Sequence, residues 1–297
     1  MKIFRFLTLF AALTVALLSC SGSIDPEENG GNQDGGNDRP GDVPQQVVSV
    51  YQQKMVAMQF TSVGCVNCPF LADAIKDVQE KHPGKIIPVA FHMNYDIEDP
   101  MTLPESAKFY ERVSYDGGQT IALPMFALNF RKSSQRIVNE SAKIISEINN
   151  QSQQYPASSG VAISTSYDNA ARELKVTAKF ISETSQVARY HIILVEDGIE
   201  YMQMGSETSD YVHNNVFRYV ASDDMRGARL NGGDPLTAGK EYEISKKIIL
   251  KESWNPESMR VVVALLTSDG SADAFGCNNA NECAVGASVD YLYKDEK

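Results

Sequence analysis

The feature that most constrains the fold is a C-x-x-C pair, Cys65 and Cys68, placed between an apolar segment and a helical pattern. The segment 54–60 (KMVAMQF) is short and apolar, which predicts a buried strand. A turn follows, and after Pro69 apolar residues recur at helical spacing until His82-Pro83-Gly84. A strand, a turn, C-x-x-C and a helix in this order are typical of a redox site.

The start of a helix gives these cysteines a chemical role. Its first turn has unpaired N–H groups and partial positive charge, so a thiolate placed there is stabilised and its pKa falls. We expect Cys65 to be the more exposed sulfur and the nucleophile, and Cys68 to resolve the mixed disulfide. Two alternatives remain open, an inert structural disulfide and half of a zinc site. The other pair, Cys277 and Cys283, lacks metal-ligand spacing, so we expect no metal.

Two further segments fit the same α/β pattern. Residues 86–91 predict a second strand that ends at His92, which is either an accessory residue of the redox site or simply the end of the strand. The strand-like run 121–129 contains Pro124, which cannot join a ladder through its nitrogen. A cis Leu123–Pro124 bond at a tight turn would account for it. An amphipathic helix over 136–151 closes this half.

Together, the run from Phe60 to Pro69, the helix and strand after it, and Leu123-Pro124 before a further strand resemble the thioredoxin fold. The resemblance implies that Pro124 faces the redox pair and contacts the substrate chain, so that Cys65, Cys68 and Pro124 form the catalytic set. The chain departs from the family pattern at Gly64, where the family often has Trp. It also departs at Gln59, where many members have a buried acid that accepts the proton of the resolving thiol.

The N-terminus predicts export and lipidation. Residues 1–19 have a positive start and an apolar stretch too short for a confident membrane-spanning helix. They end in Leu-Leu-Ser before Cys20, which resembles a bacterial lipobox and implies lipidation of Cys20 as the membrane attachment. Residues 20–46 are rich in Gly, Asn, Asp and Pro, which is typical of a flexible tether, here an acidic one. Disulfides persist in a compartment beyond the cytoplasm.

The pattern changes to period two after a linker over residues 151–160. Short alternating segments separated by turn signals predict an antiparallel β-sandwich over 154–297, following an α/β thioredoxin-like domain over 47–153. Cys277 and Cys283 bracket a short loop, and we expect them to form a structural disulfide that staples a hairpin. The segment around His213 is the most distinctive polar patch of this half, so the sandwich is a candidate binding site for a protein or a glycan.

Charge and motifs exclude several functions. The formal net charge is -11, and no basic footprint for nucleic acid is visible. Phosphate-loop and dinucleotide fingerprints are missing, and the expected chemistry requires no organic cofactor.

The lipobox, the two α/β motifs, the segment from His213 to Arg218 and the strand 254–263 together resemble the Omp28-like outer membrane lipoproteins of Bacteroidetes. This resemblance implies a lipid-anchored protein of the outer membrane, on its periplasmic face or at the cell surface. The function we expect is a thiol–disulfide oxidoreductase that acts on envelope or secreted proteins. The alternative is a surface-exposed binding or adhesin-type lipoprotein whose C-x-x-C is a structural disulfide.

Overall fold

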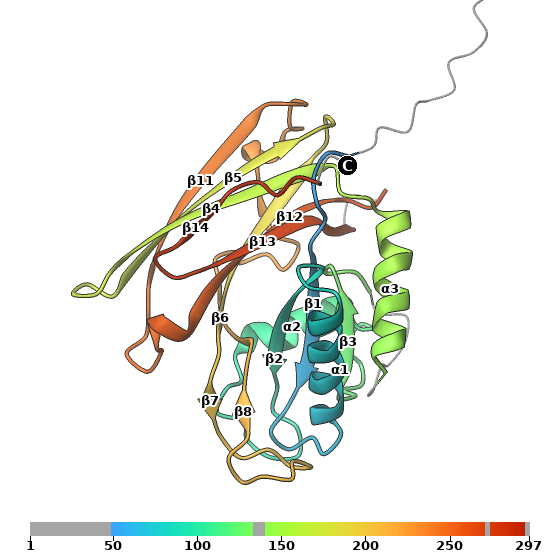
Figure 1. Ribbon diagram of the computed structural model, residues 1–297, viewed down its shortest axis with the longest axis vertical. Coiled ribbons are helices and arrows are strands. Elements are labelled where there is room, and N and C mark those ends of the chain that lie inside the picture. The colour runs from blue at the N-terminus through green and yellow to red at the C-terminus, as the bar shows by residue number, and fades with distance from the viewer. Residues whose placement is uncertain (1–48, 133–139, 271–273, 295–297) are drawn as a thin grey trace, which may run out of the picture. The chain divides into compact units, whose positions relative to one another are not determined.

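The computed structural model describes residues 49–132, 140–270 and 274–294, which form a mixed α/β fold made mostly of strands (Figure 1). The predicted signal peptide, Cys20 and the tether 20–46 lie outside the described residues. None of the helices within the described ranges has the length and hydrophobicity needed to cross a membrane.

The described residues form three α-helices, two larger sheets and a two-stranded sheet of β7 and β8. The helices are α1 (Cys68–Lys81), α2 (Pro104–Val113) and α3 (Ser141–Gln154), with short 3-10 turns at Asn231–Gly233 and Pro256–Ser258. The strands are β1 (Met55–Thr61), β2 (Ile86–His92), β3 (Met125–Leu128), β4 (Ser159–Asp168), β5 (Glu173–Ser182), β6 (Ala188–Glu196), β7 (Ile199–Glu200), β8 (Val212–His213), β9 (Val216–Val220), β10 (Ala228–Arg229), β11 (Glu241–Ile249), β12 (Met259–Ser268), β13 (Phe275–Ala284) and β14 (Ser288–Val289).

The large sheet joins strands from both predicted halves. Its order is β13-β12-β6-β9-β2-β1-β3, with β10 paired to β6. Strand β1 is parallel to β2 and antiparallel to β3. Strand β9 pairs in parallel with β2 where Val216 lies opposite Ala90, and its other edge is antiparallel to β6. One sheet therefore crosses the expected boundary between residues 153 and 154.

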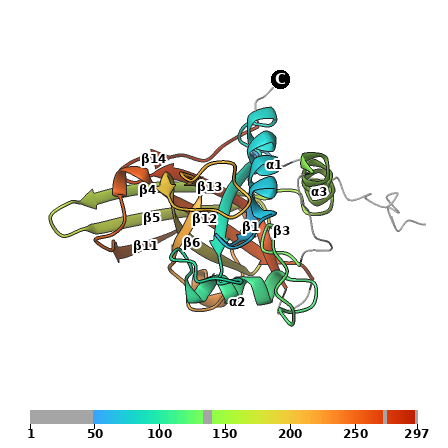
Figure 2. The same ribbon diagram turned by 90° about the horizontal axis from the view of Figure 1, so that it is seen from below.

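The alternation of side chains along β1 shows how the helices cover this sheet. Met58 packs in a core with Phe109 of α2, whereas its neighbour Ala57 packs with Leu71 of α1 and Ile144 of α3. Successive residues of a strand point to opposite faces, so α2 covers one face and α1 and α3 cover the other, as Figure 2 shows. All seven residues of β1 are buried, as expected for a strand covered on both faces.

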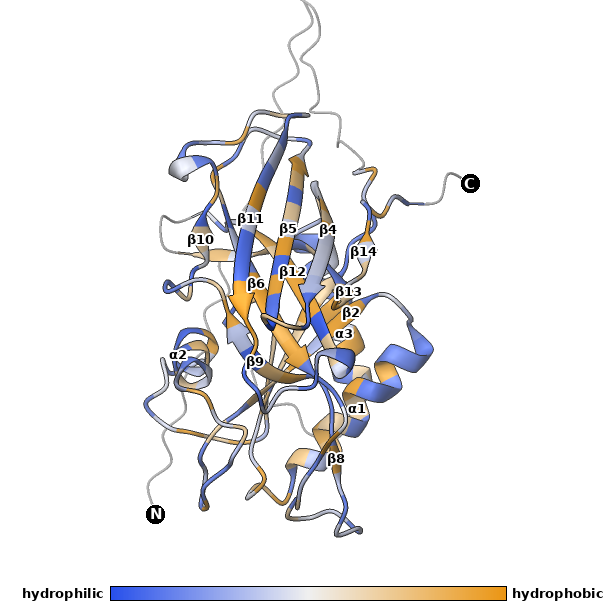
Figure 3. Ribbon diagram, turned by 90° about the vertical axis from the view of Figure 1, so that its left-hand side faces the viewer, coloured by the Kyte–Doolittle hydropathy of each residue, from blue (hydrophilic) through white to orange (hydrophobic). Residues whose placement is uncertain are grey.

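The second sheet gives the sandwich part of the fold. Its order is β11-β5-β4-β14. Val176 and Phe180 of β5 pack in one core with Leu194 of β6 and Val263 of β12. Figure 3 shows that apolar residues dominate β6 and β12, which face this second sheet. Two sheets thus pack face to face as the period-two pattern predicts, but the larger sheet continues into the α/β part.

The predicted disulfide between Cys277 and Cys283 is wrong. Both are free, buried thiols on β13, where Cys277 lies opposite Leu266 and Cys283 opposite Val261. Six residues of strand span about 20 Å, whereas the Cα atoms of a disulfide lie within about 7 Å. A register shift between Leu265 and Leu266 also places the two cysteines in different cores. Burial raises the pKa of Cys277 to about 12 and that of Cys283 to about 11, so neither forms a thiolate readily.

The expected loop is a strand because its asparagines bind neighbouring main-chain groups. The side chain of Asn279 accepts from Lys54 N and donates to the carbonyl oxygens of Gln52 and Ser159. Polar residues that suggest a solvated loop in the sequence therefore satisfy buried backbone in the fold.

Candidate functional site

The C-x-x-C pair lies where β1 passes into α1, as the sequence predicts. Cys65 and Cys68 form a disulfide with their Cα atoms 5.4 Å apart, and Cys68 is the first residue of α1. Both cysteines are buried, and Cys65, at 3% exposure, is only slightly more exposed than Cys68, at 1%. The residues between them, Val66 and Asn67, are exposed instead.

The Leu123–Pro124 bond is cis, as predicted. Met125 pairs with Phe60 near the end of β1, and extending this register by one residue places Pro124 beside Thr61. Leu123 and Met125 belong to the same buried cluster as the two cysteines. The cis-proline turn and the disulfide therefore lie at the same end of the sheet.

A hairpin from the second half of the chain covers the disulfide turn. It consists of β7, β8 and the residues between them, 199–213, and lies beside the start of α1 (Figure 1). The Nε2 atom of Gln203 donates to the carbonyl oxygens of Ser62 at 3.1 Å and Cys65 at 3.0 Å. The backbone N–H of Met204 donates to Val63 O at 2.8 Å. We call residues 199–213 the covering hairpin.

The covering hairpin approaches so closely that one position requires glycine. A Cβ atom on Gly205 would lie 2.1 Å from the carbonyl oxygen of Val66, and Gly205 has a φ of +82°. Both the space and the backbone conformation exclude an unstrained side chain there. The sequence offers no pattern that pairs Gly205 with Val66, because the contact joins segments far apart in the chain.

His92 and Asp99 form a buried pair that is hydrogen-bonded to the disulfide turn. His92 Nδ1 lies 2.7 Å from Asp99 Oδ2, and both side chains are buried. The same carboxylate oxygen accepts a hydrogen bond from the N–H of Val63, two residues before Cys65. Burial would raise the pKa of Asp99, but hydrogen bonds from His92, Val63 and Met101 hold this pKa below its ordinary value. The structure thus places His92, a candidate accessory residue, one hydrogen-bonded step from the turn.

His213, the last residue of the covering hairpin, lies next to His92. Its ring is 5.1 Å from the His92 ring and 4.7 Å from that of Tyr211, centroid to centroid. Its Nε2 atom is buried and has no hydrogen-bond partner among the described residues. Burial, with a smaller contribution from His92, lowers the pKa of His213 to about 4, so the ring is neutral near pH 7.

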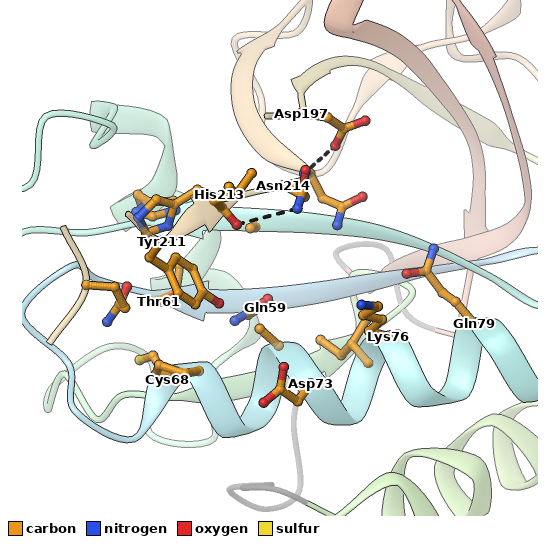
Figure 4. Close-up of a pocket in the computed structure, with 18 of the residues that line it drawn as sticks. Gln59, Thr61, Cys68, Asp73, Lys76, Gln79, Asp197, Tyr211, His213 and Asn214 are labelled. Atoms are coloured by element: carbon orange, nitrogen blue, oxygen red, sulfur yellow. Dashed lines mark hydrogen bonds between the residues drawn. The ribbon is translucent and has the colours of Figure 1, made fainter. Parts of the chain in front are cut away.

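A cavity of about 670 Å³ lies between α1, the ends of β1 and β2, and β8 (Figure 4). Cys68 and Gln59 form part of its wall, and Tyr211 points from the hairpin toward α1. His213, Asn214 and Asn215 line it, as the polar patch in the sequence suggested, whereas the neighbouring Arg218 is paired with Glu196 at 2.7 Å. Tyr211 begins the polar segment that the sequence singles out, whereas no pattern in the sequence marks Gln203, which also lines the cavity.

No group of three or more His, Cys, Asp or Glu side chains in the described ranges is arranged to hold a metal ion.

The chain is similar to one protein family and to several solved structures. The family described as outer membrane protein Omp28 matches residues 119–289, more than half of the chain. No curated protein matches. HBP35 of Porphyromonas gingivalis has a similar structure, with a TM-score of 0.65 and 15% identity, over 80% of this chain and 77% of that one. Protein AGR_C_4864 from Agrobacterium tumefaciens is similar with a TM-score of 0.53 and 16% identity, over 80% of this chain and 96% of that one. At these identities the likeness concerns the fold.

Proposed function

Since this chain belongs to the Omp28 family of outer membrane proteins, we propose that it is a lipid-anchored envelope protein whose Cys65–Cys68 pair exchanges disulfides with envelope or secreted proteins. The part before residue 154 acts as a thioredoxin-like unit, and Cys20 carries the lipid. The observation that carries the proposal is the disulfide at the first residue of α1, at the sheet end that also holds the cis Leu123–Pro124 bond.

The proposed exchange takes place at the disulfide at the start of α1. A substrate thiolate attacks the sulfur of Cys65, a bond forms between them, and the Cys65–Cys68 bond breaks with Cys68 leaving as a thiolate. A second substrate thiolate then attacks the substrate sulfur of this mixed disulfide and releases Cys65. The substrate is oxidised by two electrons and the pair is reduced. The N-terminus of α1 stabilises the thiolate of Cys68.

Access and proton transfer limit this chemistry. Both cysteines are buried beneath the covering hairpin, so the hairpin must lift before a protein thiolate can reach Cys65. Gln59, which lines the cavity with Cys68, cannot accept a proton from a thiol at neutral pH. Both features favour an exchanger that is slow until a partner displaces the hairpin.

The same burial supports a second candidate function. A disulfide that is sealed and tied by Gln203 could instead be structural, in a binding lipoprotein that uses the polar cavity or the sandwich to hold a protein or glycan. Structural disulfides resist reduction, whereas exchanging ones do not.

Trapping a mixed disulfide at Cys65 distinguishes the two functions. In Cys68→Ser, Cys65 should form a stable mixed disulfide with oxidised glutathione, detected by intact mass, because no resolving thiol remains. Cys65→Ser is the matched control and should react more slowly, since Cys68 lies deeper, at 1% exposure. Equal inertness of both variants in the folded chain would exclude exchange and favour the structural disulfide.

A further inference from the structure

Exposed apolar side chains are concentrated around the disulfide. Three segments meet there, the turn 62–70, the loop 93–98 and the covering hairpin 199–213. We call their outer surface the disulfide face. Of the thirteen large apolar residues that are exposed among the described residues, seven belong to these segments: Val66, Phe70, Ile97, Tyr201, Met202, Met204 and Val212, each 40–49% exposed.

The three segments touch one another, so these side chains surround one site. A Cβ on Gly64 would lie 2.9 Å from the side chain of Ile97, and one on Gly205 would overlap the backbone of Val66. Met204 bonds to Val63 through its backbone N–H. The covering hairpin supplies four of the seven apolar residues, so the second half of the chain builds most of this surface.

The charge of the disulfide face has one sign. None of its three segments contains Lys or Arg. Its exposed Asp and Glu side chains are Asp96, Glu98, Glu200, Glu207 and Asp210, so its charge is negative. A surface that is apolar and acidic fits a partner that is apolar and basic.

We propose that the disulfide face docks a polypeptide segment of another protein that carries both apolar and basic side chains. This names the partner class of the exchange proposed above and rests on that function. Clustered methionines adapt to different apolar side chains, and docking on the hairpin places the partner directly over the buried disulfide.

The charge of the disulfide face argues against two other occupants, a second copy of this chain and the tether 20–46. A second copy would bring the same row of carboxylates against this one, and like charges repel. The tether 20–46 has six acidic residues and one basic residue, so it is equally mismatched. The segment that fits must come from a different protein.

The test uses the chain from Ser21 to Lys297, which holds every described residue, and a fluorescent peptide of alternating lysine and leucine without cysteine. Two matched peptides replace its lysines by glutamate or its leucines by serine. The lysine–leucine peptide should bind about tenfold or more tightly than either of them, and salt should weaken its binding.

Variants locate the binding surface. The triple substitution Glu200→Lys, Glu207→Lys and Asp210→Lys should reverse the preference between the lysine and glutamate peptides. Met202→Ser with Met204→Ser should remove the advantage of leucine over serine. Glu252→Lys and Ile249→Ser change exposed residues in and just after β11, outside the disulfide face, and should leave binding unchanged.

Binding that ignores peptide charge, or that the β11 controls weaken equally, would overturn the proposal. So would a dimer of this chain that Met202→Ser with Met204→Ser dissolves, because the occupant would then be a second copy. The peptides contain no cysteine, so docking and exchange are measured separately. Docking without glutathione adduct formation at Cys65 would refute only the exchange, and the reverse result would refute only the docking.

Discussion

The side-chain amide of Gln203 donates a hydrogen bond to the main-chain oxygen of Cys65 across 3.0 Å, and so ties a hairpin from the second half of the chain to the disulfide turn. The same nitrogen also binds Ser62 O. The side chain is buried, at 7% exposure, so these bonds are shielded from competing water. Access to the disulfide therefore depends on a residue that lies outside the C-x-x-C motif.

Loss of this amide should open the disulfide to reductant. Gln203→Leu keeps a side chain of similar size but removes the donor, so that the carbonyl oxygens of Ser62 and Cys65 keep only the hydrogen bonds from the N–H groups within the turn. We expect the reduction rate of Cys65–Cys68 by dithiothreitol to rise about tenfold, the change that about 1.4 kcal/mol produces. Glu207→Gln, at an exposed position of the same hairpin, is the control and should change nothing. Equal rates for both variants would show that the hairpin does not limit access.

A substitution at Gly205 tests the contact between the covering hairpin and the disulfide turn, because an added side chain would clash there. Gly205→Ala must move the hairpin away from Val66, in addition to the strain of a positive φ. Gly198→Ala is a matched control because Gly198 also has a positive φ, +75°, but would place its Cβ in open space. The control should cost about 1 kcal/mol of unfolding free energy, and Gly205→Ala should cost more. Gly205→Ala should also speed the reduction of the disulfide, and a cost equal to that of Gly198→Ala would contradict the close contact.

Local patterns predicted the elements on which the site is built. The apolar run before Cys65, the helical spacing after Cys68 and the proline in the third strand correspond to β1, α1 and the cis Leu123–Pro124 turn. Each of these depends on neighbours within about ten residues, so the sequence alone carries the signal.

Long-range contacts cannot be predicted from local patterns in the sequence. The pairing of Ala90 with Val216 joins the two halves into one sheet, and nothing local marks either residue as a partner. The contact of Gln203 with Cys65 is of the same kind. Strand β13 was mistaken for a loop because its asparagines are polar, although their partners are buried backbone groups supplied by distant segments.

Asn279 should therefore be a stability residue. Its side chain bonds to Lys54 N, Gln52 O and Ser159 O, and it is 3% exposed. Asn279→Ala leaves three inward-facing main-chain groups unpaired and should lower the unfolding free energy by about 3 kcal/mol or more. Denaturant titration measures the loss. Asn214→Ala, at an exposed position, removes side-chain bonds to Gly198 N and Val212 O and should cost less than about 1 kcal/mol. Similar losses for both variants would contradict this role.

His213 should make stability depend on pH. Its folded pKa, about 4, lies below the ordinary histidine pKa of 6.5, so the unfolded chain binds the proton more tightly. The contribution of His213 to the unfolding free energy is then fully present above about pH 6.5. It is lost as the pH drops toward 4, which lowers the unfolding free energy by about 3 kcal/mol. The buried His191, with a pKa lowered to about 3, adds a loss of the same sign.

Replacing the imidazole ring isolates the contribution of His213 to the pH dependence of the unfolding free energy. His213→Gln should flatten the fall of unfolding free energy between pH 6.5 and 4, measured by denaturant titration at each pH, while the remaining slope reports His191. Val212→Ala, at the neighbouring exposed position, should keep the full dependence. An unchanged slope in His213→Gln would mean that the ring is not buried in the folded chain.

The reduction potential of Cys65–Cys68 tests the central claim most directly. Free thiols of the chain from Ser21 to Lys297 would be alkylated across a redox-buffer series and located by mass, with Cys277 and Cys283 as internal thiols that do not change. The account predicts a potential between about -120 and -270 mV, the range of working oxidoreductases. A potential below about -300 mV would contradict it and identify the pair as a structural disulfide.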